Sequence, residues 1–537
     1  MIDRRHFLKT MGLGMISLAS LSNCEGYAKD NRIEKPNILL ILVDDMGWSD
    51  IGYYGGEVHT PNLDRLAEQG IRFTQFHNTA KCGPSRACLL TGLYAQQCGM
   101  DKKPGYLQNC VTLGEVLRNA GYRTLMTGKY HGLDNPYDRG FDRYYGLRDG
   151  ACNYFNPGHQ REGEGVPAHK KGSQFFPRTW YINERVYEPY TPKEKDFYTT
   201  DYFTKYAIKY LDEYKDGDKP FFLYVAYTAP HDPLQAWPED IDKYRGKFMA
   251  GYETYRKARY KRQQKMGLID DSFPLSDPTY ADWNVLSEQE KIKEDMRMAI
   301  YAAMIDRVDQ NIGKLLDKIE QKGELDNTLV LFASDNGCAA SSVKNYSRYN
   351  PTANQGQMGS MTRWTKIGPS WSNVSNTPFR LYKTHTHKGG SCTPLIACWP
   401  KGIKGKNRIC HEVGHFIDIM PTLAEAGGAS YPTEFNGRKI PPMQGRSLVP
   451  IFQKKRPADR GTIFWQWSKG KGVRHEHWRL VSDNNEPWAL YDMRNDKTET
   501  NDLVKKHPEI AQKLDAMFRN WIKSSKKGQE DASAHIS

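Results

Sequence analysis

Residues 37–45 read Asn-Ile-Leu-Leu-Ile-Leu-Val-Asp-Asp, and this stretch decides the fold class. The unbroken apolar run from Ile38 to Val43 predicts a strand that is covered on both faces, as in a parallel sheet between layers of helices. The two carboxylates that follow would lie at the carboxyl end of this strand, where such sheets bind their ligands. The stretch therefore predicts both a fold class and the place of a site.

Comparable apolar runs recur along the chain, at residues 124–126, 221–227, 328–333 and 394–399. Helical patterns lie between the apolar runs, at residues 60–69, 111–120, 201–214 and 288–320. This alternation predicts an α/β fold with a large mixed, mostly parallel sheet sandwiched by helices.

The sequence pattern changes near residue 461, where short strand patterns rich in aromatic residues begin. A helical pattern follows at residues 508–523. These patterns predict a small antiparallel C-terminal subdomain. We therefore divide the chain into an export signal at 1–30, a catalytic α/β domain at 31–455 and a C-terminal subdomain at 456–537.

Residues 1–30 have the pattern of an export signal. Arg4 and Arg5, followed by Phe-Leu-Lys, resemble a twin-arginine motif, and an apolar run at 11–22 comes next. As a helix this run would reach roughly 18 Å, too little for a hydrocarbon core of about 30 Å. Leu-Ser-Asn-Cys at 21–24 resembles a lipobox, so lipidation at Cys24 and simple cleavage after Ala28 are both open. Either outcome predicts an exported protein of a Gram-negative bacterium, periplasmic or held at a membrane by a lipid anchor.

The charge of the chain points to an anionic partner. The 537 residues include 76 Lys and Arg against 63 Asp and Glu, which gives a formal net charge of +13. The ordinary globular composition excludes a disordered or fibrous protein, and the basic surplus favours nucleic acid, anionic lipid or a polyanionic substrate. No nucleic acid partner is expected, because the sequence has no basic–aromatic repeat and no recognised nucleic-acid-binding module.

A second acidic pair follows another predicted strand. Asp335 and Asn336 come directly after the run at 328–333, just as Asp44 and Asp45 come after the first strand. Carboxylate and amide oxygens are ligands that suit Ca²⁺ or Mg²⁺, although Asp-Asn-Gly also commonly forms turns. Two such pairs at two strand ends predict a divalent metal site.

Residues 82–92 read Cys-Gly-Pro-Ser-Arg-Ala-Cys-Leu-Leu-Thr-Gly. Pro84 predicts that a helix starts near Ser85, which places Cys82 at a helix N-terminus, where amide donors stabilise an anion. Arg86, one turn into the helix, would reach the same place. Taken alone, these residues leave open a reactive thiolate of low pKa and a buried small residue.

The segment 82–92 resembles the signature of the formylglycine-dependent sulfatases (type I sulfatases) of the alkaline-phosphatase-like superfamily, in which this cysteine is oxidised to formylglycine. Further segments are similar to the same family and follow in its order, at residues 36–48, 60–67, 128–132, 229–233 and 335–337. The resemblance covers essentially the whole chain after the signal.

The resemblance implies a metal centre and a modified nucleophile. The metal, usually Ca²⁺ with Mg²⁺ as the alternative, would be bound by Asp44, Asp45, Asp335, Asn336 and the residue formed from Cys82. A formylglycine-generating maturation enzyme would convert Cys82. Hydrated formylglycine is a geminal diol, so one hydroxyl can attack sulfur and the other can drive release of sulfate.

The resemblance also implies roles for basic residues. Arg86 would stabilise the formylglycine hydrate, and Lys129 and Lys383 would face the sulfate oxygens. His231 would protonate the leaving alcohol, and His131 would take the proton from the remaining hydroxyl.

Residues 383–390 depart from the family's pattern, because Lys388 stands where the family typically has Glu. Lys383 still lies five residues before that position. We expect His387 and Lys388 to line the substrate pocket and to favour a substrate with more anionic groups than the sulfate that is cleaved.

The expected activity is hydrolysis of sulfate esters of a sulfated polysaccharide or oligosaccharide. One alternative is a phosphate or phosphonate monoester hydrolase of the same superfamily, which the retained nucleophile and metal positions disfavour. Another is a non-catalytic binder of sulfated glycans, which the intact segment 82–86 disfavours. The polysaccharide, the sulfated position and the oligomeric state stay open.

Overall fold

The structure is a computed structural model that describes residues 35–102, 104–171, 176–213 and 219–533. The twin-arginine motif, Cys24 and Ala28 lie outside the described residues. The fold belongs to one compact unit that begins at Lys35, and the domain boundary at residue 455 stays a prediction.

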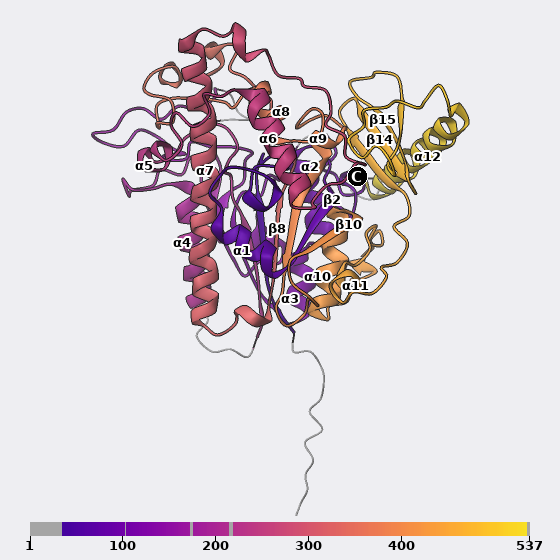
Figure 1. Cartoon of the computed structure of the whole chain (residues 1–537). Helices are drawn as coiled ribbons and strands as arrows, with labels where there is room; N and C mark the ends of the chain where they lie inside the picture. The colour runs from indigo at the N-terminus through magenta and orange to yellow at the C-terminus, as the bar shows by residue number, and fades with distance from the viewer. Residues whose placement is uncertain (1–34, 103, 172–175, 214–218, 534–537) are drawn as a thin grey trace, which may run out of the picture. The chain divides into compact units, whose positions relative to one another are not determined.

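A ten-stranded mixed sheet forms the centre of the protein (Figure 1). In chain order its strands are β1 Asn37–Val43, β2 Ile71–His77, β3 Arg123–Gly128, β4 Arg143–Leu147, β5 Trp180–Ile182, β6 Arg185–Tyr187, β7 Phe221–Ala226, β8 Thr328–Ser334, β9 Cys392–Cys398 and β10 Arg408–His415. Across the sheet they follow the order β10-β2-β9-β8-β1-β7-β3-β4-β5-β6. The five strands from β8 to β4 are parallel, whereas β9 and β5 are each antiparallel to both neighbours. The predicted mixed, mostly parallel sheet is confirmed.

Both faces of the sheet are covered, and β1 shows why its sequence is apolar without interruption. Leu39, Ile41 and Val43 pack in one cluster of buried side chains, and Ile38, Leu40 and Leu42 pack in a second. Helices of the first cluster are α1 Pro61–Gln69, α4 Thr199–Asp212 and α7 Glu288–Gln321. Helices of the second are α2 Cys82–Thr91, α3 Leu113–Asn119 and α10 Ile419–Gly427. Each apolar residue of the strand therefore packs in one layer or the other.

The chain ends in a four-stranded antiparallel sheet with a helix against it. The strands are β13 Ile463–Trp467, β14 Gly470–His475, β15 Trp478–Ser482 and β16 Ala489–Asp492, and the helix is α12 Pro508–Ser533. Figure 1 shows α12 beside this sheet, and the rings of Phe464 and Trp521 stack with centroids 4.8 Å apart. The predicted small antiparallel C-terminal sheet is confirmed.

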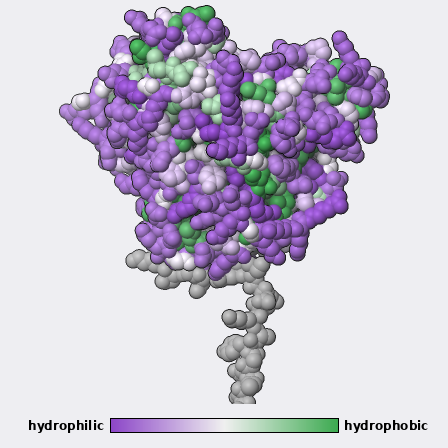
Figure 2. Space-filling model, viewed as in Figure 1, coloured by the Kyte–Doolittle hydropathy of each residue, from purple (hydrophilic) through white to green (hydrophobic). Residues whose placement is uncertain are grey.

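The remaining regular elements are short, apart from one helix. They are α5 Pro238–Asp242, α6 Tyr252–Lys265, α8 Pro369–Ser375, α9 Lys388–Ser391 and α11 Val449–Phe452, with a hairpin of β11 Glu434–Phe435 and β12 Arg438–Lys439. The face of the protein in Figure 2 is mainly hydrophilic, with smaller hydrophobic areas between polar ones. Among the described residues, no helix combines the length and the apolar character that a bilayer crossing requires.

Two details of the sequence prediction are corrected. The run at 394–399 belongs to β9, which is antiparallel to its neighbours, whereas the alternation of elements suggested another parallel strand. Helix α2 begins at Cys82 and not near Ser85, because Lys81 is extended and Pro84 fits within the first helical turn.

Candidate active site

Parallel pairing brings the two acidic pairs together at the carboxyl edge of the sheet. Val43 of β1 pairs with Ser334 of β8, so the residues after them emerge side by side. The amide nitrogen Nδ2 of Asn336 donates a hydrogen bond to Oδ1 of Asp45 at 2.6 Å. Asp45 has a φ of 66°, a left-handed conformation that is uncommon for non-glycine residues and that Asp adopts more readily than most.

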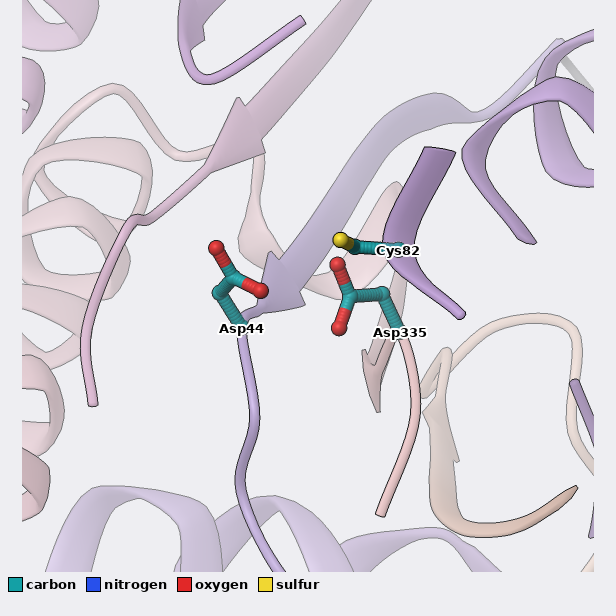
Figure 3. A group of neighbouring side chains, drawn as sticks. All are labelled: Asp44, Cys82 and Asp335. Carbon is teal, nitrogen blue, oxygen red and sulfur yellow. The ribbon is translucent and has the colours of Figure 1, made fainter. Parts of the chain in front are cut away.

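Cys82 reaches the same place from the first turn of α2. Its thiol sulfur and one carboxylate oxygen each of Asp44 and Asp335 all lie within 4.8 Å of one another (Figure 3). Burial raises the pKa of Cys82, but the nearby ammonium groups of Lys129, Lys383 and Lys81 outweigh burial and lower that pKa to about 7. The side chain is buried and faces the carboxylates, so the reactive-thiolate interpretation fits this geometry better than a simple packing role.

The acidic groups offer more acceptor atoms than the neighbouring donors satisfy. Within the described part of the chain, Asp44 Oδ1, Asp45 Oδ2 and Asn336 Oδ1 are buried and have no hydrogen-bond partner. Leaving buried acceptors unsatisfied costs free energy. All three oxygens come from residues that the sequence predicts as metal ligands. The donor set therefore fits a hard divalent cation.

The pKa values of the carboxylates are shifted, as expected for several acids that are buried close together. Burial, with the charge of the neighbouring acid, raises the pKa of Asp44 and of Asp335 to about 6. Arg86 opposes this effect, because its Nε and Nη2 lie 2.9 and 2.8 Å from Asp335 Oδ2. A bound cation would favour the ionised carboxylates in the same way.

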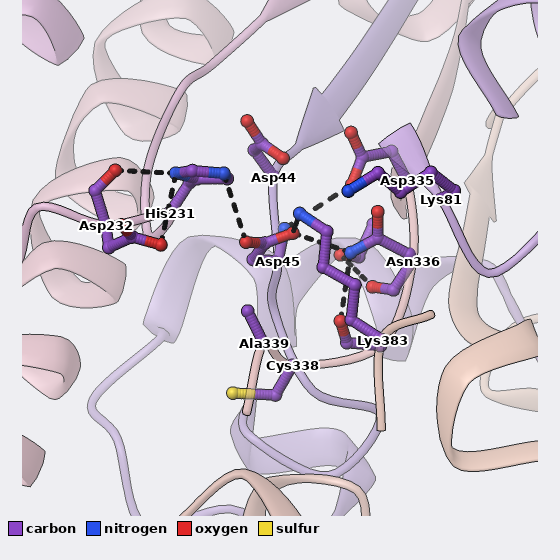
Figure 4. A network of polar contacts seen from close by, with 12 residues as sticks. Asp44, Asp45, Lys81, His231, Asp232, Asp335, Asn336, Cys338, Ala339 and Lys383 are labelled. Atoms are coloured by element: carbon purple, nitrogen blue, oxygen red, sulfur yellow. Dashed lines mark hydrogen bonds and ion pairs between the residues drawn. The ribbon is translucent and has the colours of Figure 1, made fainter. Parts of the chain in front are cut away.

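Three predicted basic residues meet these acids directly. Lys129 Nζ contacts the Asp44 carboxylate. Lys383 Nζ contacts the Asp45 carboxylate (Figure 4). Arg86 Nη1 also donates to the backbone oxygen of Lys129 at 2.9 Å. The structure thus gathers the predicted cations around the predicted ligands.

The segment that carries Lys383 is fixed by its backbone. The Lys383 N–H donates to the carbonyl of Cys338 at 3.0 Å, and the Thr384 N–H donates to that of Ala80 at 2.8 Å. These bonds tie the segment to the loop after β8 and to the residues that lead into α2. The lysine is therefore held between the two loops that provide the acids and the cysteine.

His231 lies on the other side of Asp45. Its Nε2 is 3.4 Å from Asp45 Oδ2, and its Nδ1 is 2.6 Å from the backbone oxygen of Asp232 (Figure 4). A carbonyl can only accept, so Nδ1 carries a proton and Nε2 is the atom that faces the site. Burial lowers the pKa of His231, and Asp45 partly opposes this shift.

His131 approaches from the loop after β3. Its backbone oxygen lies 3.9 Å from the position a Cβ would take at Gly83, and its Nδ1 is buried without a partner among the described residues. Burial, followed by Lys129, lowers the pKa of His131 well below the usual range. A φ of 64° again marks a strained residue near the site. A neutral imidazole suits the predicted role of a base.

The C-terminal subdomain holds the segment after Lys383 through a buried ion-pair cluster. Glu499 Oε2 lies 2.9 Å from His387 Nδ1 and accepts the backbone N–H of Lys388 at 2.9 Å. Its Oε1 lies 2.7 Å from Arg479 Nε, and Arg479 Nη2 donates to the carbonyl of Thr386 at 2.7 Å. We call Glu499 and Arg479 the clasp.

The prediction that Lys388 lines the substrate pocket is wrong. Its side chain is fully buried, and its ammonium lies 5.2 and 5.8 Å from the ring centroids of Phe379 and Phe273. The ammonium therefore faces the aromatic interior and has no hydrogen-bond partner in the described residues. His387 is 5% exposed and its Nδ1 faces Glu499, so its contact with substrate stays a prediction.

The sequence did not single out the clasp or Asp232. Asp232 supports His231 and lies 3.4 Å from Lys366, and its place beside His231 in the Ala-Pro-His-Asp-Pro segment was a usable signal. Glu499 had no local signal, since it lies 112 positions from His387.

Comparison with known proteins agrees with this arrangement. The family model described as Sulfatase matches residues 36–429, and the model described as N-sulphoglucosamine sulphohydrolase, C-terminal, matches residues 381–527. An uncharacterized sulfatase of Schizosaccharomyces pombe is 34% identical, with 92% of this chain and 94% of that protein covered. An arylsulfatase of Klebsiella aerogenes is 33% identical, with 82% and 96% covered.

A solved structure gives the same result for the fold. The crystal structure of Ps i-CgsB in complex with k-i-k-neocarrahexaose has a TM-score of 0.64 and 25% identity, with 91% of this chain and 93% of that chain covered. The family match spans most of the chain and includes every residue of the acidic cluster, Cys82 and Lys383. The chain belongs to the sulfatase family and is a sulfuric ester hydrolase.

Proposed function

We propose that the protein hydrolyses sulfate esters of a sulfated polysaccharide or oligosaccharide, with formylglycine at position 82 as nucleophile and Ca²⁺ or Mg²⁺ beside it. The observation that carries the proposal is the meeting of the Cys82 sulfur with the Asp44 and Asp335 carboxylates within 4.8 Å. A nucleophile in that position lies where a cation held by the acids would act on it.

The cation would be held by Asp44, Asp45, Asp335 and Asn336, three of which present buried oxygens that accept no hydrogen bond from the described residues. When bound, it would lower the cost of deprotonating the nucleophile and polarise a sulfuryl oxygen. The protein's own contribution is to fix these four side chains at two adjacent strand ends.

The basic residues of the site would bind the sulfate oxygens, stabilise the nucleophile and transfer protons. Lys129 and Lys383 would exchange their contacts with Asp44 and Asp45 for the oxygens of the sulfate, and neutralise charge as the S–O bond breaks. Arg86 would stabilise the hydrated aldehyde. His231, in the doubly protonated form that the neighbouring Asp45 carboxylate favours, would donate a proton from Nε2 to the leaving alcohol. His131 would accept one from the remaining hydroxyl of residue 82.

A carbohydrate substrate is supported by charge and by similarity. The net charge of +13 favours a polyanion. One similar protein was solved in complex with k-i-k-neocarrahexaose, and the C-terminal family model is described as N-sulphoglucosamine sulphohydrolase, C-terminal. These observations favour a sulfated sugar over a simple aryl sulfate as the natural substrate.

We also propose that residues 1–30 direct export to the periplasm of a Gram-negative bacterium, with a lipid anchor at Cys24 as one form of the mature protein. The mass of the mature N-terminus distinguishes a lipidated Cys24 from cleavage after Ala28. A mature protein that retains Met1 would contradict export.

A sulfate-release assay tests the activity. The enzyme, expressed with a formylglycine-generating maturation enzyme, should release sulfate from 4-nitrophenyl sulfate and from some members of a panel of sulfated oligosaccharides. Cys82→Ala and Cys82→Ser should abolish release while the far-UV circular dichroism stays unchanged. Release from neither class of substrate would contradict the proposal.

A further inference from the structure

A cavity of about 470 Å³ lies beside the C-terminal subdomain, outside the cluster of catalytic residues. Its wall combines the apolar side chains of Trp467, Phe518 and Ile522 with the polar or charged side chains of Gln96, Asp101, Lys102, Gln466, Ser468 and Lys471. Ligand pockets in proteins have volumes of about 300–1,000 Å³ and combine aromatic walls with a few polar groups. The cavity has the size and the chemistry of a binding site.

The turn between β13 and β14 connects this cavity to the catalytic centre. Trp467, at the end of β13, lies with its ring centroid 5.7 Å from the ammonium of Lys81, the residue directly before Cys82. Gly470, at the start of β14, is packed so closely that a Cβ there would lie 2.3 Å from Thr386 Oγ1. The turn therefore touches both the Cys82 helix and the segment that follows Lys383.

The cavity is lined in part by the hairpin itself. Trp467 pairs with Gly470, so Ser468 and Lys469 form a two-residue turn, and the φ of 52° at Ser468 is ordinary for a turn of this length. Trp467, Ser468 and Lys471 line the cavity from this hairpin.

The wall of the cavity matches an anionic sugar. An indole ring gives a flat apolar surface with an adjacent polar edge, which suits the face of a pyranose. The ammonium groups of Lys102 and Lys471 suit a sulfate or a carboxylate, while Asp101 and the two glutamines can bond to hydroxyls. Lys471 is itself braced, with its ammonium 6.0 Å from the ring centroid of Trp488.

We propose that this cavity is a second carbohydrate subsite, which binds an anionic sugar unit next to the one whose sulfate is cleaved. Trp467 stacks on the sugar ring, and Lys102 and Lys471 face its sulfate or carboxylate group. The inference rests on the proposed glycan substrate and extends it, because it requires at least two sugar units and a second anionic group.

The test compares a short and a long substrate in matched variants. Trp467→Ala and Lys471→Ala remove cavity groups, Trp467→Phe keeps an aromatic surface, and Lys469→Ala changes an exposed lysine of the same turn that does not line the cavity. The kcat/KM on 4-nitrophenyl sulfate should stay within about twofold of wild type in all four variants, because this substrate is too small to fill both sites.

Binding of oligosaccharides is measured by calorimetry in the Cys82→Ala background. The probes are carrageenan oligosaccharides, which carry only sulfate, chondroitin sulfate oligosaccharides, which carry both groups, and desulfated chondroitin oligosaccharides, which carry only carboxylate. For the probes that bind, Trp467→Ala and Lys471→Ala should each raise Kd by roughly tenfold, whereas Trp467→Phe and Lys469→Ala should leave Kd unchanged. The probe with the largest Lys471 effect identifies sulfate or carboxylate as the recognised group.

Equal losses on 4-nitrophenyl sulfate and on oligosaccharides would make the turn a structural element and overturn the subsite. Unchanged oligosaccharide binding in Trp467→Ala, or no binding of any probe, would overturn it as well. Binding that depends on Trp467 in a protein that releases no sulfate would instead contradict the proposed function and leave the subsite standing.

Discussion

The carboxylate of Glu499 accepts a hydrogen bond from the backbone N–H of Lys388, with the two atoms 2.9 Å apart. This contact joins the C-terminal subdomain to the segment whose first residue, Lys383, faces Asp45. The same carboxylate group pairs with Arg479, which holds the Thr386 carbonyl. The C-terminal subdomain therefore helps to fix the position of Lys383, the proposed sulfate-binding lysine.

Glu499→Gln keeps the shape of the clasp but leaves Arg479 buried without its partner charge. We expect a loss of about 3–5 kcal/mol in the free energy of unfolding, as for other broken buried pairs. We also expect Glu499→Gln to lower kcat/KM on 4-nitrophenyl sulfate by roughly tenfold, because Lys383 loses its position. In a Lys383→Ala background the same substitution should lower kcat/KM by less than about twofold. If the losses in kcat/KM of Glu499→Gln and Lys383→Ala multiply in the double variant, the clasp stabilises the fold without positioning Lys383.

Lys388→Met removes a buried ammonium that has no hydrogen-bond partner. Burial lowers the pKa of Lys388 to about 7, whereas an unfolded chain titrates its lysines near about 10.4. Between these values the unfolded chain binds more protons, so the wild-type protein gains stability as pH rises, and the cost of Lys388 is greatest below about pH 7. The variant should be more stable by about 1–4 kcal/mol at neutral pH.

The advantage of Lys388→Met should shrink between pH 7 and pH 9.5, as measured by urea unfolding. Lys469→Met, at an exposed position, should show no such dependence. A destabilised Lys388→Met variant, or an advantage that does not change with pH, would contradict the burial of an unpaired ammonium.

Removal of divalent cations should abolish turnover. Chelation followed by desalting should stop sulfate release, and Ca²⁺ or Mg²⁺ should restore it. At a cation concentration of 100 times Kd the fold should gain about 2.7 kcal/mol, seen as a rise in melting temperature. Asp44→Asn should lose both effects, whereas Asp271→Asn, an exposed control, should keep them. Full activity of the chelated enzyme would contradict the metal assignment.

His231→Ala should affect poor leaving groups most. A sugar alcohol needs the proton that His231 Nε2 would supply, so the loss on a sugar sulfate should be about 10²–10⁴-fold. The loss on 4-nitrophenyl sulfate should be much smaller, because 4-nitrophenolate leaves without a proton. His59→Ala, at an exposed position, serves as the control. Equal losses on both substrates would contradict the role of a general acid.

Local sequence was enough to predict the centre of the sheet and the acids at its edge. The apolar run of β1 needs both layers of helices, and an acidic pair directly after a strand can only emerge at its carboxyl end. The roles of Lys129, His131 and His231 came instead from the resemblance to a family, since isolated lysines and histidines carry no such information.

Other features had no local signal. Strand β2 was missed because it has neither an unbroken apolar run nor a regular alternation, since Thr74 and Gln75 are adjacent polar residues. Its polar side chains are buried through partners from distant segments, such as Asn407 for Arg72. The direction of β9 is not encoded in its apolar run. The contacts of Trp467 with Lys81 and of Glu499 with His387 join residues far apart in the sequence, so only the fold brings them together.

The central claim is that residue 82 acts as formylglycine, and peptide mass spectrometry of the active enzyme tests it most directly. The account predicts an aldehyde or its hydrate at position 82, in a fraction that rises in proportion to specific activity when the maturation enzyme is co-expressed. A fully active preparation in which residue 82 is entirely an unmodified cysteine thiol would contradict it.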